Sequence, residues 1–170
     1  MIDFSKITTF IFDVDGVLTD GMVHAFADGE FARVFNIKDG YAIEKALKAG
    51  YHVCIISGGF EKGVQKRLEF LHIPHIYLGI KNKVEVFEKY LFENNILPHQ
   101  VLYMGDDLPD MEVMQLSGIA TCPADAALDI LAIAHYISPK AGGKGAVRDV
   151  IEQTMKSQDT WFQSPVSATS

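Results

Sequence analysis

Short apolar runs alternate with amphipathic stretches along this chain, and this alternation constrains the fold more than any other feature. The apolar runs are rich in β-branched and aromatic residues and lie at residues 8–14, 52–56, 101–104, 119–122 and 136–138. The stretches between them place apolar side chains at helical spacing, over residues 39–49, 60–71, 83–94 and 110–116. Strands that alternate with helices of about 10 to 15 residues indicate βαβ units. The pattern predicts an α/β fold with a doubly wound, Rossmann-like parallel sheet flanked by helices.

One segment interrupts the alternation. Residues 22–35 alternate irregularly around Asp28-Gly29, a dipeptide typical of tight turns, and we expect a small β-hairpin inserted after the first strand. The remaining pattern leads us to expect a single domain over residues 1–156. Residues 157–170 are polar and small apart from Trp161 and Phe162, so a flexible tail is expected there.

Charge and composition exclude several functions. The 170 residues carry a net charge of −7 at pH 7, whereas a general nucleic-acid binder needs clustered Lys and Arg. No apolar run reaches the roughly 18 residues of a membrane span. We therefore expect a cytoplasmic protein with no nucleic-acid and no membrane partner. Cys54 and Cys122 lack the spacing of a metal or redox site, and reduced, buried or half-buried thiols are expected.

Acidic clusters directly follow two of the expected strands. Asp13-Val14-Asp15-Gly16 follows the first strand, and a second cluster runs from Gly105 through Asp106 and Asp107 to Asp110. Ligands of a doubly wound sheet bind beyond the carboxyl ends of its strands, so both clusters are expected to line one cleft. Like charges this close need a cation or a shared proton, and oxygen ligands favour Mg²⁺. Either cluster alone also fits a solvated acidic turn or a helix N-cap, but the two together favour a metal site.

Four motifs, in this order along the chain, resemble those of the haloacid dehalogenase-like superfamily of phosphatases, over about residues 8–150. Asp13-Val14-Asp15-Gly16-Val17 is similar to the first motif, DxDG[TV]. Ser57 and Lys83 match the second and third motifs, and residues 105–110 match the fourth, GDDxxD. The resemblance implies a phosphatase that works through an aspartyl-phosphate intermediate. Because only about twenty residues separate Asp20 from the helix expected near residue 39, the chain is expected to lack a cap domain.

The resemblance also implies a role for each motif residue. Asp13 is the expected nucleophile and Asp15 the general acid and base, while Ser57 and Lys83 hold the phosphoryl oxygens. Asp13, Asp106 and the backbone carbonyl of Asp15 are the expected Mg²⁺ ligands. Two further carboxylates are expected to support the metal waters or Lys83, namely Asp107 and Asp110.

Three stretches resemble the subfamily of 3-deoxy-D-manno-octulosonate 8-phosphate phosphatases: residues 15–21, 35–43 and 142–152. This resemblance implies a sugar-acid phosphate substrate, a role in lipopolysaccharide biosynthesis and a homotetramer in which hairpins pair and neighbouring subunits complete each site. The substrate contacts it suggests are Asn36, Asp39, Gly40, Gly58, Arg67 and Lys83. The glycine-rich segment near residue 142 leads to Lys144 and Arg148, which we expect as further cations for the substrate. Its glycines let the backbone approach a ligand closely, so this segment is also expected to act as a lid over the substrate site.

Two positions depart from the subfamily pattern. Gly59 and Glu44 stand where its members carry Arg, so a nine-carbon ulosonate 9-phosphate is an alternative substrate. A non-catalytic phosphatase-like assembly protein is a further alternative, although every catalytic carboxylate is kept. A phosphorylated receiver module is disfavoured, because the strand end at Ser57 carries no Asp to accept a phosphoryl group.

Overall fold

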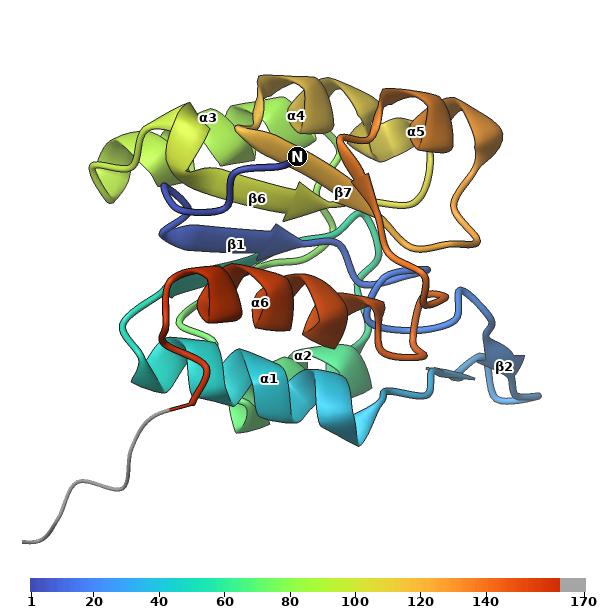
Figure 1. Ribbon diagram of the computed structural model, residues 1–170. Coiled ribbons are helices and arrows are strands. Elements are labelled where there is room, and N and C mark those ends of the chain that lie inside the picture. Colours follow the sequence, from blue (N-terminus) through green and yellow to red (C-terminus); the bar gives the residue numbers. More distant parts are fainter. Residues whose placement is uncertain (163–170) are drawn as a thin grey trace, which may run out of the picture.

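A computed structural model describes residues 1–162 of the chain, and six parallel strands form its central sheet (Figure 1). The strands follow the order β5-β4-β1-β6-β7-β8. Their bounds are Thr9–Phe12 for β1, His52–Ile56 for β4, His75–Tyr77 for β5, Val101–Met104 for β6, Ile119–Cys122 for β7 and Tyr136–Ile137 for β8. Every neighbouring pair is parallel, which confirms the predicted doubly wound sheet.

Helices cover both faces of the sheet (Figure 1). One layer contains α1 (Ile37–Lys48), α2 (Lys62–Phe70) and α6 (Ala146–Ser157), and the other contains α3 (Lys83–Glu93), α4 (Met111–Leu116) and α5 (Leu128–Ile133). Two short 3₁₀ helices, η1 (Pro98–Gln100) and η2 (Leu108–Asp110), lie beside β6. The strands read as continuous apolar runs because both faces of the sheet are buried.

Successive side chains of the central strands enter opposite layers. Phe10 and Phe12 of β1 pack in the layer of α1, whereas Ile11 packs in the layer of α3. Cys54 of β4 also lies in the α3 layer, and both it and Cys122 are free, buried thiols, as predicted. This packing holds β1, β4 and β6 in register, so that the residues following them meet at one edge.

The inserted hairpin is present and small. Its strands β2 (His24–Ala25) and β3 (Phe31–Ala32) pair antiparallel, and Gly29 takes a positive φ of 87° in the turn. The hairpin projects past the carboxyl ends of the sheet strands (Figure 1). Its apolar side chains are exposed, among them Met22, Phe26, Phe31 and Val34.

The chain end differs from the expected flexible tail over the part that the structure describes. Ser157 is the last residue of α6, and the Gln158 side chain donates to the carbonyls of Phe4 and Ile7 at 2.8 Å each. The Trp161 ring is only 6% exposed and joins the core. The prediction was wrong for residues 157–162. Their mostly polar side chains suggested exposure to solvent, whereas this stretch packs on the N-terminal segment. Residues 163–170 of the predicted tail lie outside the described residues.

Neither strand β5 nor helix α5 was predicted. β5 is a three-residue edge strand of half-buried residues directly after Pro74. Two of its residues, His75 and Tyr77, carry polar ring atoms, so the segment lacks the apolar run that identified the other strands. α5 has only six residues, too few for a helical period to stand out. Within residues 1–162, no helix is both long and apolar enough to cross a membrane.

Candidate active site

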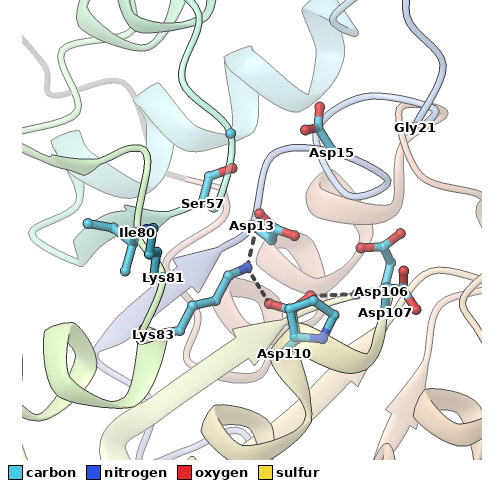
Figure 2. Close-up of a pocket in the computed structure, with 13 residues that line it drawn as sticks. Asp13, Asp15, Gly21, Ser57, Ile80, Lys81, Lys83, Asp106, Asp107 and Asp110 are labelled. Atoms are coloured by element: carbon cyan, nitrogen blue, oxygen red, sulfur yellow. Dashed lines mark hydrogen bonds and ion pairs between the residues drawn. The ribbon is translucent and has the colours of Figure 1, made fainter.

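A cavity of about 470 Å³ opens at the carboxyl edge of the sheet, between the segments that follow β1, β4 and β6. The residues of all four motifs line it, as the sequence predicted: Asp13, Asp15, Ser57, Gly58, Lys83, Asp106, Asp107 and Asp110. Figure 2 shows Lys83 reaching between Asp13 and Asp110, with Ser57 and Asp15 on the far side of Asp13. The fold therefore brings together side chains that are up to 97 positions apart in the chain, from Asp13 to Asp110.

Lys83, the first residue of α3, is the buried one of the two lysines that line this cavity. Its Nζ lies 2.8 Å from Asp110 Oδ1 and 3.3 Å from Asp13 Oδ1, and its side chain is 6% exposed (Figure 2). Burial alone lowers the pKa of Lys83, but the charges of Asp13 and Asp110 outweigh it and raise that pKa above the ordinary value. Lys83 therefore stays protonated and holds both carboxylates.

Asp110 is a fully buried anchor for this cluster. Besides Lys83, its Oδ1 accepts from the Tyr103 hydroxyl at 2.7 Å, and its Oδ2 accepts from the Asp106 amide at 3.1 Å. A Cβ at Gly105 would lie 2.3 Å from the Cβ of Asp110, so glycine is needed for this close approach. These contacts fit the supporting role that the sequence suggested for Asp110.

Asp13 and Asp106 carry the carboxylates that a metal ion would use. One oxygen from each of Asp13, Asp106 and Asp110 lies within 4.8 Å of the others, and Asp110 is already bound by three donors. Burial, followed by the charge of Asp110, raises the pKa of both Asp13 and Asp106 to about 7. Buried carboxyls that resist ionisation in this way fit a site completed by a hard divalent cation such as Mg²⁺.

The loop after β1 is shaped to admit Asp106. Gly16 has a φ of +79°, and a Cβ there would lie 1.8 Å from Asp106 Oδ2. Any larger residue at position 16 would both strain the backbone and displace this carboxylate. The glycine of the first motif therefore makes room for the aspartate of the fourth.

Arg33 holds Asp15, and the sequence reasoning missed it. Its Nε lies 2.5 Å from Asp15 Oδ1 and its Nη2 lies 3.4 Å from Oδ2, so the guanidinium donates a hydrogen bond to each carboxylate oxygen. Arg33 follows β3 in the hairpin and is the one Lys or Arg of residues 22–35. That isolated cation in an otherwise apolar and acidic insertion was the signal that could have found it.

The other expected substrate contacts do not line this cavity in a single chain. Asn36 caps α1 and accepts from the Lys38 amide at 2.8 Å, and buried Asp39 accepts from the Arg148 amide at 2.9 Å. Burial raises the pKa of Asp39 to about 6. Gly40 allows Arg67 to pack against α1, because a Cβ there would lie 2.7 Å from Arg67 Nη2. Within one chain these residues join α1 to its neighbours.

The glycine-rich segment lies against the first motif and does not cover the cavity. The Gly143 amide donates to the Val17 carbonyl at 3.0 Å, and a Cβ at Gly142 would lie 1.9 Å from the carbonyl oxygen of Gly16. Lys144 and Arg148 face a second cavity of about 460 Å³ that is shared with Asn36, Lys38 and Lys140. Within residues 1–162 of a single chain this segment packs against the loop after β1, and a lid over a neighbouring subunit's site stays a prediction.

Comparisons with known proteins extend these observations. No protein-family model matches the chain. The chain is 41% identical over 153 residues to the 3-deoxy-D-manno-octulosonate 8-phosphate phosphatase KdsC of Escherichia coli K12, with 90% of this chain and 81% of that protein covered. It superimposes with a TM-score of 0.90 on the same-named enzyme of Moraxella catarrhalis, crystallised with magnesium, phosphate and KDO, at 30% identity over 93% of this chain and 91% of that one. The TM-score is also 0.90 to a subfamily III A haloacid dehalogenase superfamily hydrolase of Legionella pneumophila, at 31% identity and with 92% and 86% of the chains covered.

A parallel sheet with four motifs at its carboxyl edge, and with only a hairpin inserted after β1, defines a haloacid dehalogenase-like hydrolase without a cap domain. The extent of the match to curated relatives narrows this class further. The chain belongs to the 3-deoxy-D-manno-octulosonate 8-phosphate phosphatase family and is a phosphoric monoester hydrolase.

Proposed function

We propose that this enzyme hydrolyses 3-deoxy-D-manno-octulosonate 8-phosphate through a phosphoryl group carried on Asp13. The observation that carries the proposal is the position of Asp13, which is buried at the end of β1, 3.3 Å from Lys83 Nζ, and faces the cavity (Figure 2). Its Oδ1 also accepts from the Val14 amide at 2.7 Å, which fixes the carboxylate. The substrate comes from the names of relatives that cover most of the chain.

In the first step, an oxygen of Asp13 attacks phosphorus and the bond from phosphorus to the sugar oxygen breaks. Asp15, in its protonated form, gives its proton to the departing sugar oxygen, so that an alcohol leaves instead of an alkoxide. Ser57 and Lys83 hold the phosphoryl oxygens while this occurs. The result is an acyl phosphate on Asp13 and an ionised Asp15.

In the second step, Asp15 removes a proton from a water molecule whose oxygen attacks the same phosphorus. The bond between phosphorus and Asp13 then breaks, and inorganic phosphate and both carboxyl groups are restored. Mg²⁺ on Asp13, Asp106 and the carbonyl of Asp15 would supply positive charge for the transferring group. A carboxylate nucleophile thus divides the hydrolysis into two displacements.

We further propose that the active form is a homo-oligomer, the tetramer that the resemblance to the subfamily implies. Met22, Phe26 and Val34 of the hairpin are between 55% and 69% exposed, and the strands β2 and β3 have only two residues each. A hairpin this small is marginal alone, and its unpaired edges suit pairing with another hairpin. Sedimentation of the purified protein tests this, and a monomer at every concentration would exclude it.

The cytoplasmic location remains a prediction from the sequence.

The function is tested by a screen of phosphate release from sugar and ulosonate phosphates, with Mg²⁺ and with chelator. We expect the eight-carbon substrate to have the highest kcat/KM, activity to be lost in chelator, and Asp13→Asn to be inactive yet folded. Preference for a nine-carbon 9-phosphate would identify the alternative substrate, which stays open because Gly59 and Glu44 stand where the subfamily carries Arg. No release from any substrate would indicate the assembly protein instead.

A further inference from the structure

Arg33 is the one cation of the hairpin, and it is buried against the catalytic loop instead of facing solvent. Its side chain is only 11% exposed, although it comes from an insertion whose other side chains are mostly exposed. Removing a guanidinium from water is costly unless it is paired. The structure pairs it with two carboxylates, Asp15 on one side and Glu61 on the other, the latter with Nη1 to Oε1 at 3.6 Å.

We propose that Arg33 is the positioning residue of Asp15 and couples the hairpin to the proton transfers of the proposed reaction. This inference rests on the proposed function, because it assigns Asp15 the acid and base role. The Asp15 side chain is 40% exposed, so few packing contacts restrict its rotamer. A planar guanidinium that meets both carboxylate oxygens fixes their plane as well as their position.

The surroundings of Arg33 favour positioning over direct contact with substrate. Arg33 does not line the 470 Å³ cavity. It borders a space of about 10 Å³ that Asp15, Glu61 and Val64 also line. That space holds no sugar, so the guanidinium reaches a substrate only through the carboxylate that it holds.

Gly59 lies directly beside the pair formed by Arg33 and Asp15. A Cβ at position 59 would lie 3.3 Å from Asp15 Oδ2 and 3.8 Å from Arg33 Nη2. A long side chain there would therefore compete for the space occupied by this pair. Glu61, just before α2, balances part of the guanidinium charge at 3.6 Å from Nη1, although Nη1 has no hydrogen-bond partner among the described residues.

The test compares two substrates that differ in their leaving group, and it is run in the wild-type enzyme and in the Asp15→Asn enzyme. Steady-state kinetics of Arg33→Gln and Arg33→Lys are measured with the sugar phosphate, which needs a proton on its leaving oxygen, and with 4-nitrophenyl phosphate, which does not. We expect Arg33→Gln to lower kcat for the sugar phosphate about 10- to 100-fold, less than loss of the acid itself, and to lower kcat for the aryl ester only a few-fold. Arg33→Lys should recover part of the loss.

Adding Arg33→Gln to an Asp15→Asn enzyme should change kcat less than about twofold, because groups that act as a unit are not additive. Glu30→Gln on the same hairpin is the control for a charge change and should match wild type in both assays. Equal losses on both substrates, or a full additional loss in the Asp15→Asn background, would overturn the proposal, and so would an effect confined to KM. A wild-type enzyme that releases no phosphate would instead refute the proposed function, and with it this role.

Discussion

Replacing Asp110 by Asn removes one charge from the buried cluster and changes little else in shape. All three partners of Asp110 are donors: the Lys83 ammonium, the Tyr103 hydroxyl and the Asp106 amide. An asparagine keeps one acceptor oxygen, but its amide group must turn a donor toward one of these donors. The substitution therefore leaves one buried donor unsatisfied and leaves Lys83 with Asp13 as its only anionic partner.

The expected cost follows from the burial of this pair. Removing one partner of a buried ion pair costs about 3–5 kcal/mol of unfolding free energy, and we take the lower end because asparagine retains one acceptor. In a chain of this length each kcal/mol lowers Tm by about 2–4 °C, so the expected loss is roughly 6–12 °C. Activity should fall as well, because Lys83 then binds Asp13, the proposed nucleophile, more closely.

Thermal unfolding followed by tryptophan fluorescence measures this effect, since Trp161 is buried in the core. The scans are run at fixed protein concentration and in chelator, so that neither association nor bound metal shifts Tm. Asp107→Asn is the matched control: Asp107 is exposed and its side chain accepts only from the adjacent Leu108 amide. It should stay within about 2 °C of wild type, as surface changes usually do.

A Tm for Asp110→Asn within the range of the control would refute the reasoning. In that case the Lys83–Asp110 contact would contribute no more than an exposed pair, and the carboxylate would be tied to catalysis alone. A similar loss in both variants would instead point to the whole acidic loop, since Asp107 shares no partner with Lys83.

Three further predictions follow from individual contacts. Burial raises the pKa of Asp39 from 3.8 to about 6, so the folded chain holds this proton more tightly than the unfolded chain. The stability that the protonated form contributes is therefore lost as the pH rises from about 4 to about 6. Asp39→Asn should therefore melt higher than wild type at pH near 7.5 and no higher near pH 4; an equal difference at both pH values contradicts this. Gly16→Ala should lower activity and raise the Mg²⁺ concentration needed for half-maximal activity, because the added Cβ would collide with the Asp106 carboxylate. Gly29→Ala is the control: Gly29 has a similar φ and no atom within 4 Å of the added Cβ, so this variant should retain activity. Asp106→Asn should raise the Mg²⁺ concentration for half-maximal activity by about tenfold or more, as loss of metal-site groups does, and an unchanged titration would remove Asp106 from the site.

The fold and the catalytic cluster could be predicted because each rests on a local pattern. Strands β1, β4 and β6 are buried on both faces, so their apolar runs stand out, and the residue after each run must lie at the same edge. The order of Asp13, Ser57 and Asp106 along the chain then fixes which of these strand ends supplies which group, whereas Lys83 was assigned through the resemblance of its motif. No long-range information is needed for either step.

The partners of those residues could not be predicted in the same way. The contact between Arg33 and Asp15 depends on the angle at which the hairpin leaves the sheet, and no sequence period encodes that angle. Asn36 and Asp39 resembled substrate contacts, although Asn36 lies directly before a helix, which is the usual signal of an N-cap. Such residues can serve the chain that carries them and a neighbouring subunit, and one chain shows only the first role.

The charges around the cavity indicate where the remaining recognition of substrate must come from. Seven ionisable side chains line it, five acidic and two basic: Asp13, Asp15, Asp106, Asp107, Asp110, Lys81 and Lys83. Lys83 is already paired with Asp13 and Asp110, so a phosphate group enters a region of net negative charge, where the positive charge of a metal is needed. Arg33 is likewise occupied by Asp15. A sugar acid brings a further carboxylate, and the cations of a second cavity, Lys38, Lys140 and Lys144, lie apart from this one in a single chain. Lys81 is the other cation of the cavity, and a second subunit that presents further cations there would add positive charge for this carboxylate, which is compatible with the proposed oligomer.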